Sequence, residues 1–133
     1  MILLDTHTLI WLDEGNDRLG KKALKKIDES LKASKLFVAT ISYWEIAMLI
    51  EKERIEMSIP LEIWRNNLVS NGLQEIPLSA SIAIQSAQLE SFHGDPADRI
   101  ITATALSTNA MLCTADKKLL NWEQSLSVLN AKN

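Results

Sequence analysis

Short apolar segments alternate with segments of helical periodicity along the chain, and this alternation restricts the fold more than any other feature of the sequence. The apolar segments are typical of buried strands and cover residues 2–4, 36–39, 73–77, 111–114 and 127–129. The helical patterns cover residues 9–12, 21–31, 43–52, 61–71, 80–89 and 97–107, and a short helix is expected after Asp116. Strands that are apolar throughout and are separated by helices favour a mostly parallel sheet with helices on both faces. The sequence therefore predicts an α/β three-layer sandwich.

The length and composition fit one folded unit over residues 1–133. No Gly-, Ser- or Pro-rich linker, charge block or internal repeat divides the chain, and a chain of this size buries enough surface for one core. Its one cysteine, Cys113, cannot form an internal disulfide, and no apolar run approaches the roughly 20 residues of a membrane-spanning helix. We therefore expect a cytoplasmic protein that does not span a membrane. The net charge of −3 argues against binding of nucleic acid by bulk attraction to phosphates, so any such contact must be local.

Acidic residues stand where their side chains can reach one edge of this sheet. Asp5 follows the first predicted strand, Glu45 lies in the helix after the second, and Asp116 follows the fourth. Asp98 opens the helix that leads into the fourth strand. Ligands of parallel sheets bind beyond the carboxyl ends of the strands, where such side chains meet. Asp98 joins the others only if its loop returns over the sheet.

Each acid also has a purely structural explanation as a helix cap. Ser42 and Glu45 form an S-x-x-E capping box, and Asp95 can cap a helix whose first residue is Pro96. The acids after the first and fourth strands can cap the helices that follow them. Considered together, however, these acids concentrate negative charge, and no Lys or Arg precedes Arg18. A folded protein tolerates such a concentration when cations bind or when carboxyl pKa values rise.

Carboxylate oxygens favour a hard divalent ion such as Mg²⁺ or Mn²⁺. Zinc would need His or Cys at the same place, and the candidates, His7, His93 and Cys113, give little support for such a site. The sequence lacks the glycine-rich loops that cradle nucleotide phosphates and the G-x-S-x-G turn of serine hydrolases. Metal-assisted hydrolysis is the chemistry that remains.

Ordered motifs in the chain resemble those of the PIN-domain ribonucleases, and more narrowly of VapC-type toxins from bacterial toxin-antitoxin pairs. These motifs are LDTHTLIWL at 4–12, SYWEI at 42–46, HGDPADR at 93–99 and LCTAD at 112–116. The resemblance spans nearly the whole chain. One departure is Gly94, where relatives often carry a basic residue that can contact phosphate.

The resemblance implies a fold, a reaction and a set of partners. The fold is a five-stranded parallel sheet of order 3-2-1-4-5. The catalytic and metal-binding quartet falls on Asp5, Glu45, Asp98 and Asp116, with Thr114 as an accessory polar group. The implied reaction is Mg²⁺- or Mn²⁺-dependent hydrolysis of a structured RNA such as a transfer RNA, leaving a 3'-hydroxyl and a 5'-phosphate. A cognate antitoxin protein covers the active site in this family, and a homodimer is expected.

Basic and aromatic residues give weaker signals. Arg99, beside Asp98, is an expected accessory residue, and Lys117 and Lys118 lie next to another quartet acid; a lysine stripe at 21–26 fits a solvated helix face. The tryptophans at 11, 44 and 64 are expected to fill the core or a dimer interface rather than to stack on bases.

Two other functions stay open: a catalytically silent PIN-like binding module, and a phospho-receiver signalling domain. The receiver needs an aspartate at the end of its middle strand, and residues 73–79 contain none.

Overall fold

A parallel sheet forms the centre of the molecule, as the alternation of apolar and helical segments predicts. The structure is a computed structural model that describes residues 1–122 and 125–133. In the described residues the sheet has five strands in the order β3-β2-β1-β4-β5, and all neighbouring strands are parallel. The strands are β1 (Ile2–Leu4), β2 (Leu36–Ala39), β3 (Gln74–Ile76), β4 (Met111–Thr114) and β5 (Val128–Asn130). The predicted fold class and strand order are confirmed.

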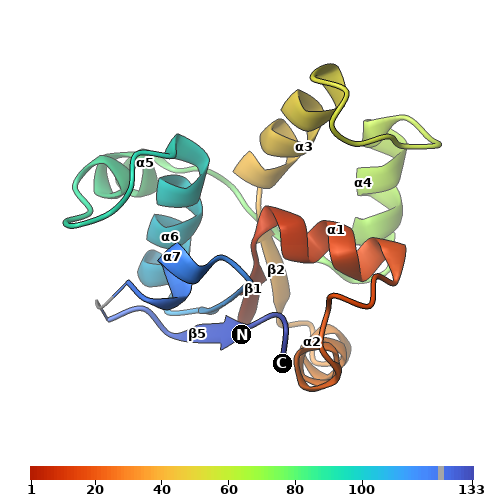
Figure 1. Cartoon of the computed structure of the whole chain (residues 1–133), viewed down its shortest axis with the longest axis horizontal. Coiled ribbons are helices and arrows are strands. Elements are labelled where there is room, and N and C mark those ends of the chain that lie inside the picture. The colour runs from red at the N-terminus through yellow and green to blue at the C-terminus, as the bar shows by residue number, and fades with distance from the viewer. Residues whose placement is uncertain (123–124) are drawn as a thin grey trace.

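Helices cover both faces of the sheet. They are α1 (Thr6–Glu14), α2 (Lys21–Lys32), α3 (Ile41–Glu51), α4 (Leu61–Ser70), α5 (Ala80–Ala87), α6 (Pro96–Thr108) and α7 (Lys117–Leu120). In Figure 1, α1, α2 and α4 lie on one side of the strands, and α5, α6 and α7 lie on the other. Helix α3 contacts both α1 and α6 and so bridges the two sides. Within the described residues, no helix is long and apolar enough to cross a membrane.

The side chains of each strand divide between two apolar clusters, because successive residues of a strand point to opposite faces. Ile2 and Leu4 of β1 pack into the cluster beneath α1, α2 and α4. Leu3 points the other way and packs with Ile101 of α6 and Leu112 of β4. The three central strands, β1, β2 and β4, are largely buried on both faces, which explains their apolar sequences. The edge strands β3 and β5 are only partly buried and carry polar residues.

The tryptophans have different environments. Trp64 of α4 is buried in the first cluster, and its indole Nε1 donates a hydrogen bond to Asp13 at 2.8 Å. Trp11 is half-buried against the same cluster. Trp44 of α3 is 54% exposed, so it does not fill the core of this chain.

The last residues of the chain pack against the start of α2. Gly20 donates its backbone N–H to the carbonyl of Ala131 at 2.8 Å, and Lys22 donates to the carbonyl of Asn133 at 2.9 Å. A Cβ atom on Gly20 would lie 2.1 Å from the carbonyl carbon of Asn133, so only glycine permits this approach. The contact holds Lys132 at the carboxyl edge of the sheet, beside the site described next.

Candidate active site

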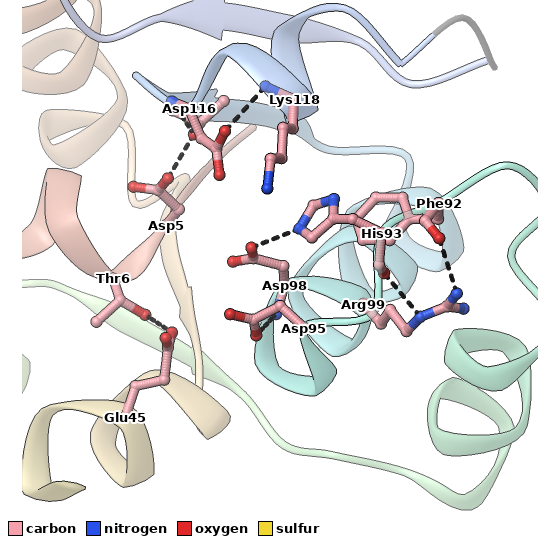
Figure 2. Close-up of polar contacts among 11 residues, drawn as sticks. Asp5, Thr6, Glu45, Phe92, His93, Asp95, Asp98, Arg99, Asp116 and Lys118 are labelled. Atoms are coloured by element: carbon pink, nitrogen blue, oxygen red, sulfur yellow. Dashed lines mark hydrogen bonds and ion pairs between the residues drawn. The ribbon is translucent and has the colours of Figure 1, made fainter.

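A cleft with a volume of about 380 Å³ lies at the carboxyl edge of the sheet. Its walls come from the ends of β1 and β4 and from the first turns of α3 and α6. The carboxylates that line it are Asp5, Glu45, Asp95, Asp98 and Asp116. All members of the predicted quartet therefore meet in one cleft, and Figure 2 shows that they come from separate elements.

Asp5 connects β1 to α1 and is 8% exposed. One oxygen, Oδ1, accepts the backbone N–H of Thr8 at 2.9 Å and caps α1. The other, Oδ2, accepts the hydroxyl proton of Thr114 at the end of β4. The Thr114 oxygen in turn accepts the backbone N–H of Asp116 at 3.1 Å. The predicted accessory residue Thr114 thus links the acids that follow β1 and β4.

Glu45 projects from α3 toward α1, where Thr6 donates its hydroxyl proton to Oε1 of Glu45. The Thr6 hydroxyl also lies in hydrogen-bond contact with Ser42, at 2.9 Å. Burial raises the pKa of Glu45 above its ordinary value; the Thr6 hydrogen bond opposes this shift, and the negative charges of Asp98 and Asp95 add to it.

The predicted capping box at Ser42 and Glu45 is wrong. Helix α3 begins at Ile41, with Thr40 in the N-cap position, so both residues lie inside the helix. Their side chains bond to Thr6 of α1 rather than to the end of their own helix. Hydrogen bonds between α3 and Thr6 of α1 take the place of the expected capping bonds within α3, and they orient the Glu45 side chain toward the cleft.

Asp98 reaches the cleft because α6 runs antiparallel to the strand that follows it, which places the helix N-terminus at the carboxyl edge of the sheet. Asp95 caps α6 by accepting the backbone N–H of Asp98 at 3.1 Å, with Pro96 in the first turn, as predicted. Oδ2 of Asp98 lies 2.7 Å from Nε2 of His93. Burial raises the pKa of Asp98, the contact with His93 opposes this, and the charges of Asp95 and Asp116 add to the rise.

Asp116 caps the short helix α7, since its Oδ1 accepts the backbone N–H of Lys118 at 2.8 Å. The capping roles proposed for Asp5, Asp95 and Asp116 are therefore confirmed. A cap engages one carboxylate oxygen through part of its lone-pair capacity. Capping and ion binding are compatible at this edge.

Metal-ligating atoms converge in two overlapping groups within the part of the chain that the structure describes. One group is Glu45, Asp95 and Asp98, and the other is His93, Asp98 and Asp116; the ligand atoms of each lie within 4.8 Å of one another. Oxygen donors at this separation suit a hard divalent cation. Sequence reasoning missed Asp95 and His93 as members of the site, although Asp95 was identified as a cap at the same helix end.

Arg99 lies behind the cleft rather than in it. Its guanidinium donates to the backbone carbonyls of His93, Ser86 and Phe92 at 3.0–3.1 Å and to that of Leu89 at 3.5 Å. Figure 2 shows it on the far side of His93 from Asp98. Arg99 therefore holds the segment between α5 and α6, and this arrangement does not support the expected direct role in the site.

Comparison with known proteins identifies the family. A model of the PIN domain matches residues 2–122. The chain belongs to the PIN-domain family. This PIN domain is also 38% identical over 119 residues to Ribonuclease VapC22 of Mycobacterium tuberculosis, covering 89% of this chain and 88% of that protein. The sequence resemblance to VapC-type PIN-domain ribonucleases is thus confirmed.

Solved structures share the fold of this PIN domain. A VapBC2 complex from Rickettsia felis, bound to a DNA fragment from the promoter, is 17% identical with a TM-score of 0.72, and the match covers 98% of both chains. A toxin-antitoxin complex from Klebsiella pneumoniae is 22% identical with a TM-score of 0.63 over 98% of both chains. At sequence identities this low, the structural similarity establishes the fold of the PIN domain and no more.

Proposed function

We propose that this PIN-domain protein is an endoribonuclease that uses Mg²⁺ or Mn²⁺ and acts as the toxin of a toxin-antitoxin pair. The observation that carries the proposal is the convergence of the quartet Asp5, Glu45, Asp98 and Asp116 on one cleft, in a chain whose relative is a VapC ribonuclease. We assign the quartet the catalytic and metal-binding roles. A divalent ion held by these carboxylates would supply the Lewis acidity that activates water and neutralises charge on the scissile phosphate.

The neighbouring side chains hold the carboxylates in place for this reaction. Thr114 fixes Oδ2 of Asp5, and Thr6 fixes Oε1 of Glu45, so each acid enters the cleft in one orientation. Rigid ligands favour catalysis because no reorganisation is needed when the substrate arrives. The expected products are a 3'-hydroxyl and a 5'-phosphate.

Charge explains how RNA and a partner would each use the cleft. The carboxylates repel a phosphate unless cations offset them, and Lys132 in the cleft wall adds positive charge. A basic side chain from an antitoxin can occupy the same negative cleft, and we propose such a protein partner. The solved relatives include toxin-antitoxin complexes. We also propose a homodimer, in which the exposed Trp44 is a candidate contact.

The two alternative functions have less support. A receiver of the flavodoxin-like class has the strand order 2-1-3-4-5, whereas β1 is the central strand here. A silent binding module has no need of four carboxylates in one cleft.

We further propose that residues 1–133 act as a single domain in the cytoplasm, and that the substrate is a structured RNA such as a transfer RNA.

The test combines RNA cleavage with growth. Purified protein is incubated with total RNA in EDTA, Mg²⁺, Mn²⁺ or Zn²⁺, and the same chain is expressed in cells without a partner. We expect cleavage with Mg²⁺ or Mn²⁺, growth arrest, and loss of both with Asp98→Asn. The control is Asp28→Asn, the same change at an exposed position of α2. Cleavage by metal-stripped protein in EDTA, or undiminished toxicity of Asp98→Asn at equal protein level, would refute the proposal.

A further inference from the structure

His93 is held in a fixed position with its ring nitrogen Nε2 directed toward Asp98, a residue of the cleft wall. Its ring stacks on Phe92, with centroids 4.4 Å apart and planes at 21°. The backbone carbonyls of both residues accept hydrogen bonds from Arg99 at 3.0 Å. These contacts fix the backbone and the ring, and they leave Nε2 facing Oδ2 of Asp98 (Figure 2).

The two groups of converging ligand atoms differ in chemistry. Glu45, Asp95 and Asp98 offer oxygen alone, whereas the second group replaces one oxygen with the His93 imidazole. Asp98 belongs to both groups, so two positions for an ion lie side by side. Mg²⁺ binds oxygen and water, whereas Mn²⁺, which also binds carboxylate oxygens, accepts an imidazole nitrogen beside them, as transition-metal ions do.

We propose that His93 is a metal ligand, and that His93, Asp98 and Asp116 form a mixed nitrogen–oxygen position that takes a transition-metal ion such as Mn²⁺ in preference to Mg²⁺. The all-oxygen position at Glu45, Asp95 and Asp98 accepts either ion. This inference rests on the proposed function only in that a divalent ion enters the cleft. Sequence patterns alone give little support for a metal site built on histidine or cysteine, whereas the structure places His93 next to Asp98.

The Nε2 atom of His93, which lies against Asp98, can play one of two mutually exclusive roles. Nε2 either donates a proton to Oδ2 of Asp98 or offers its lone pair to an ion, with the ring proton on Nδ1. If His93 only orients Asp98, Nε2 keeps its proton when an ion enters the cleft. If His93 is a ligand, an ion in the cleft is bonded directly to nitrogen, and magnetic resonance can detect that bond.

The test is pulsed electron paramagnetic resonance of the protein loaded with Mn²⁺ alone, without RNA. The chain has only two histidines, and the other, His7, is an exposed residue of the cleft wall outside both groups. We expect nitrogen modulation of the Mn²⁺ signal in wild type and in His7→Gln, and its loss in His93→Gln. We also expect His93→Gln to weaken Mn²⁺ binding about tenfold or more, the scale of losses at metal-site residues, and to change Mg²⁺ binding less than twofold.

A second measurement assigns the nitrogen without altering His93. In His7→Gln protein grown with ¹⁵N-histidine, the modulation should change from the ¹⁴N to the ¹⁵N pattern, so the result does not depend on the folding of His93→Gln. Wild type that binds Mn²⁺ without nitrogen modulation overturns the inference, as does modulation that persists in folded His93→Gln. Either result leaves the proposed function intact, since that stands or falls on RNA cleavage with the ion present.

Discussion

Replacement of Asp98 by asparagine should stabilise the ion-free protein, although Asp98 lies at the centre of the proposed site. Asp98 is the acid shared by both ligand groups, and its neighbours in them include Asp95 and Asp116. The amide keeps the size of the side chain and its ability to accept a hydrogen bond from His93, while it removes the charge. A residue that serves only the fold would lose stability on the same change.

The magnitude follows from the separation of the charges. Two unit charges 4.8 Å apart, the upper limit within each group, repel by about 3.5 kcal/mol at an effective dielectric constant of about 20. The Asp98 side chain is 21% exposed, and the weaker contact with His93 offsets part of the gain. We expect a net stabilisation of about 1–2 kcal/mol, or a rise in Tm of about 3–8 °C.

The effect should depend on pH with a definite sign. Burial and neighbouring charges raise the pKa of Asp98 in the folded protein above its ordinary value of 3.8. The folded state therefore holds this proton to higher pH than the unfolded chain does. The corresponding stability is present below about pH 3.8 and is lost as pH rises through the folded pKa. The advantage of Asp98→Asn over wild type should accordingly be small in acid and full at neutral pH.

Thermal melts in EDTA and across a Mg²⁺ series measure both effects. Wild type should gain about 2.7 kcal/mol at an ion concentration of 100 Kd, and Asp98→Asn should respond far less, so the two melting curves should exchange order as Mg²⁺ rises. Asp28→Asn, an exposed change on α2, should follow wild type throughout. Asp98→Asn protein that melts below wild type in EDTA at neutral pH and keeps the full Mg²⁺ response would refute the charge argument.

Three further predictions test the surroundings of the cleft. Burial raises the pKa of Cys113 to about 12, so its thiol should resist alkylation at pH 8 until the protein unfolds, and rapid labelling of native protein would contradict its burial. Arg99→Lys keeps the charge but cannot bond four carbonyls, so it should lower the free energy of unfolding in urea by about 2–3 kcal/mol. It should also speed amide hydrogen exchange in residues 86–93, and unchanged exchange would show that Arg99 does not hold this segment. Gly20→Ala should cost about 1–3 kcal/mol, because its Cβ collides with Asn133, whereas Gly94→Ala, which has nothing within 4 Å, should be nearly neutral.

The central strands β1, β2 and β4 could be predicted from the sequence because burial on both faces leaves a local apolar signal. All five predicted segments overlap observed strands, and the largest shifts are one residue at an end, as in Val128–Asn130. Helix α1 extends from Thr6 to Glu14, beyond the predicted 9–12. Its first turn carries polar residues that are nevertheless buried, such as Thr6 and Thr8, so apolar periodicity could not reveal it.

The site was predicted in part. Its acids follow strand ends, a position that topology alone brings together, and all four lie in the cleft. Two other members were missed as part of the site. His93 reaches Asp98 because Arg99 fixes its backbone, a contact that apolar periodicity and capping patterns do not reveal. Asp95 was predicted as the cap of α6 from the Pro96 that follows it, but the local pattern does not show that its carboxylate also lines the cleft. The orientation of Glu45 likewise depends on Thr6, which is 39 residues away in sequence.

The close packing of Gly20 against Asn133 determines where the protein can be modified for experiments. Asn133 lies beside the start of α2, and its neighbour Lys132 forms part of the cleft wall. An affinity tag fused after Asn133 would therefore start next to the carboxylates, where a histidine tag could itself capture the ions under study. Met1 precedes β1 at the opposite edge of the sheet, and its carbonyl accepts the N–H of Met111 at the start of β4. Fusions for metal-binding measurements therefore belong at Met1.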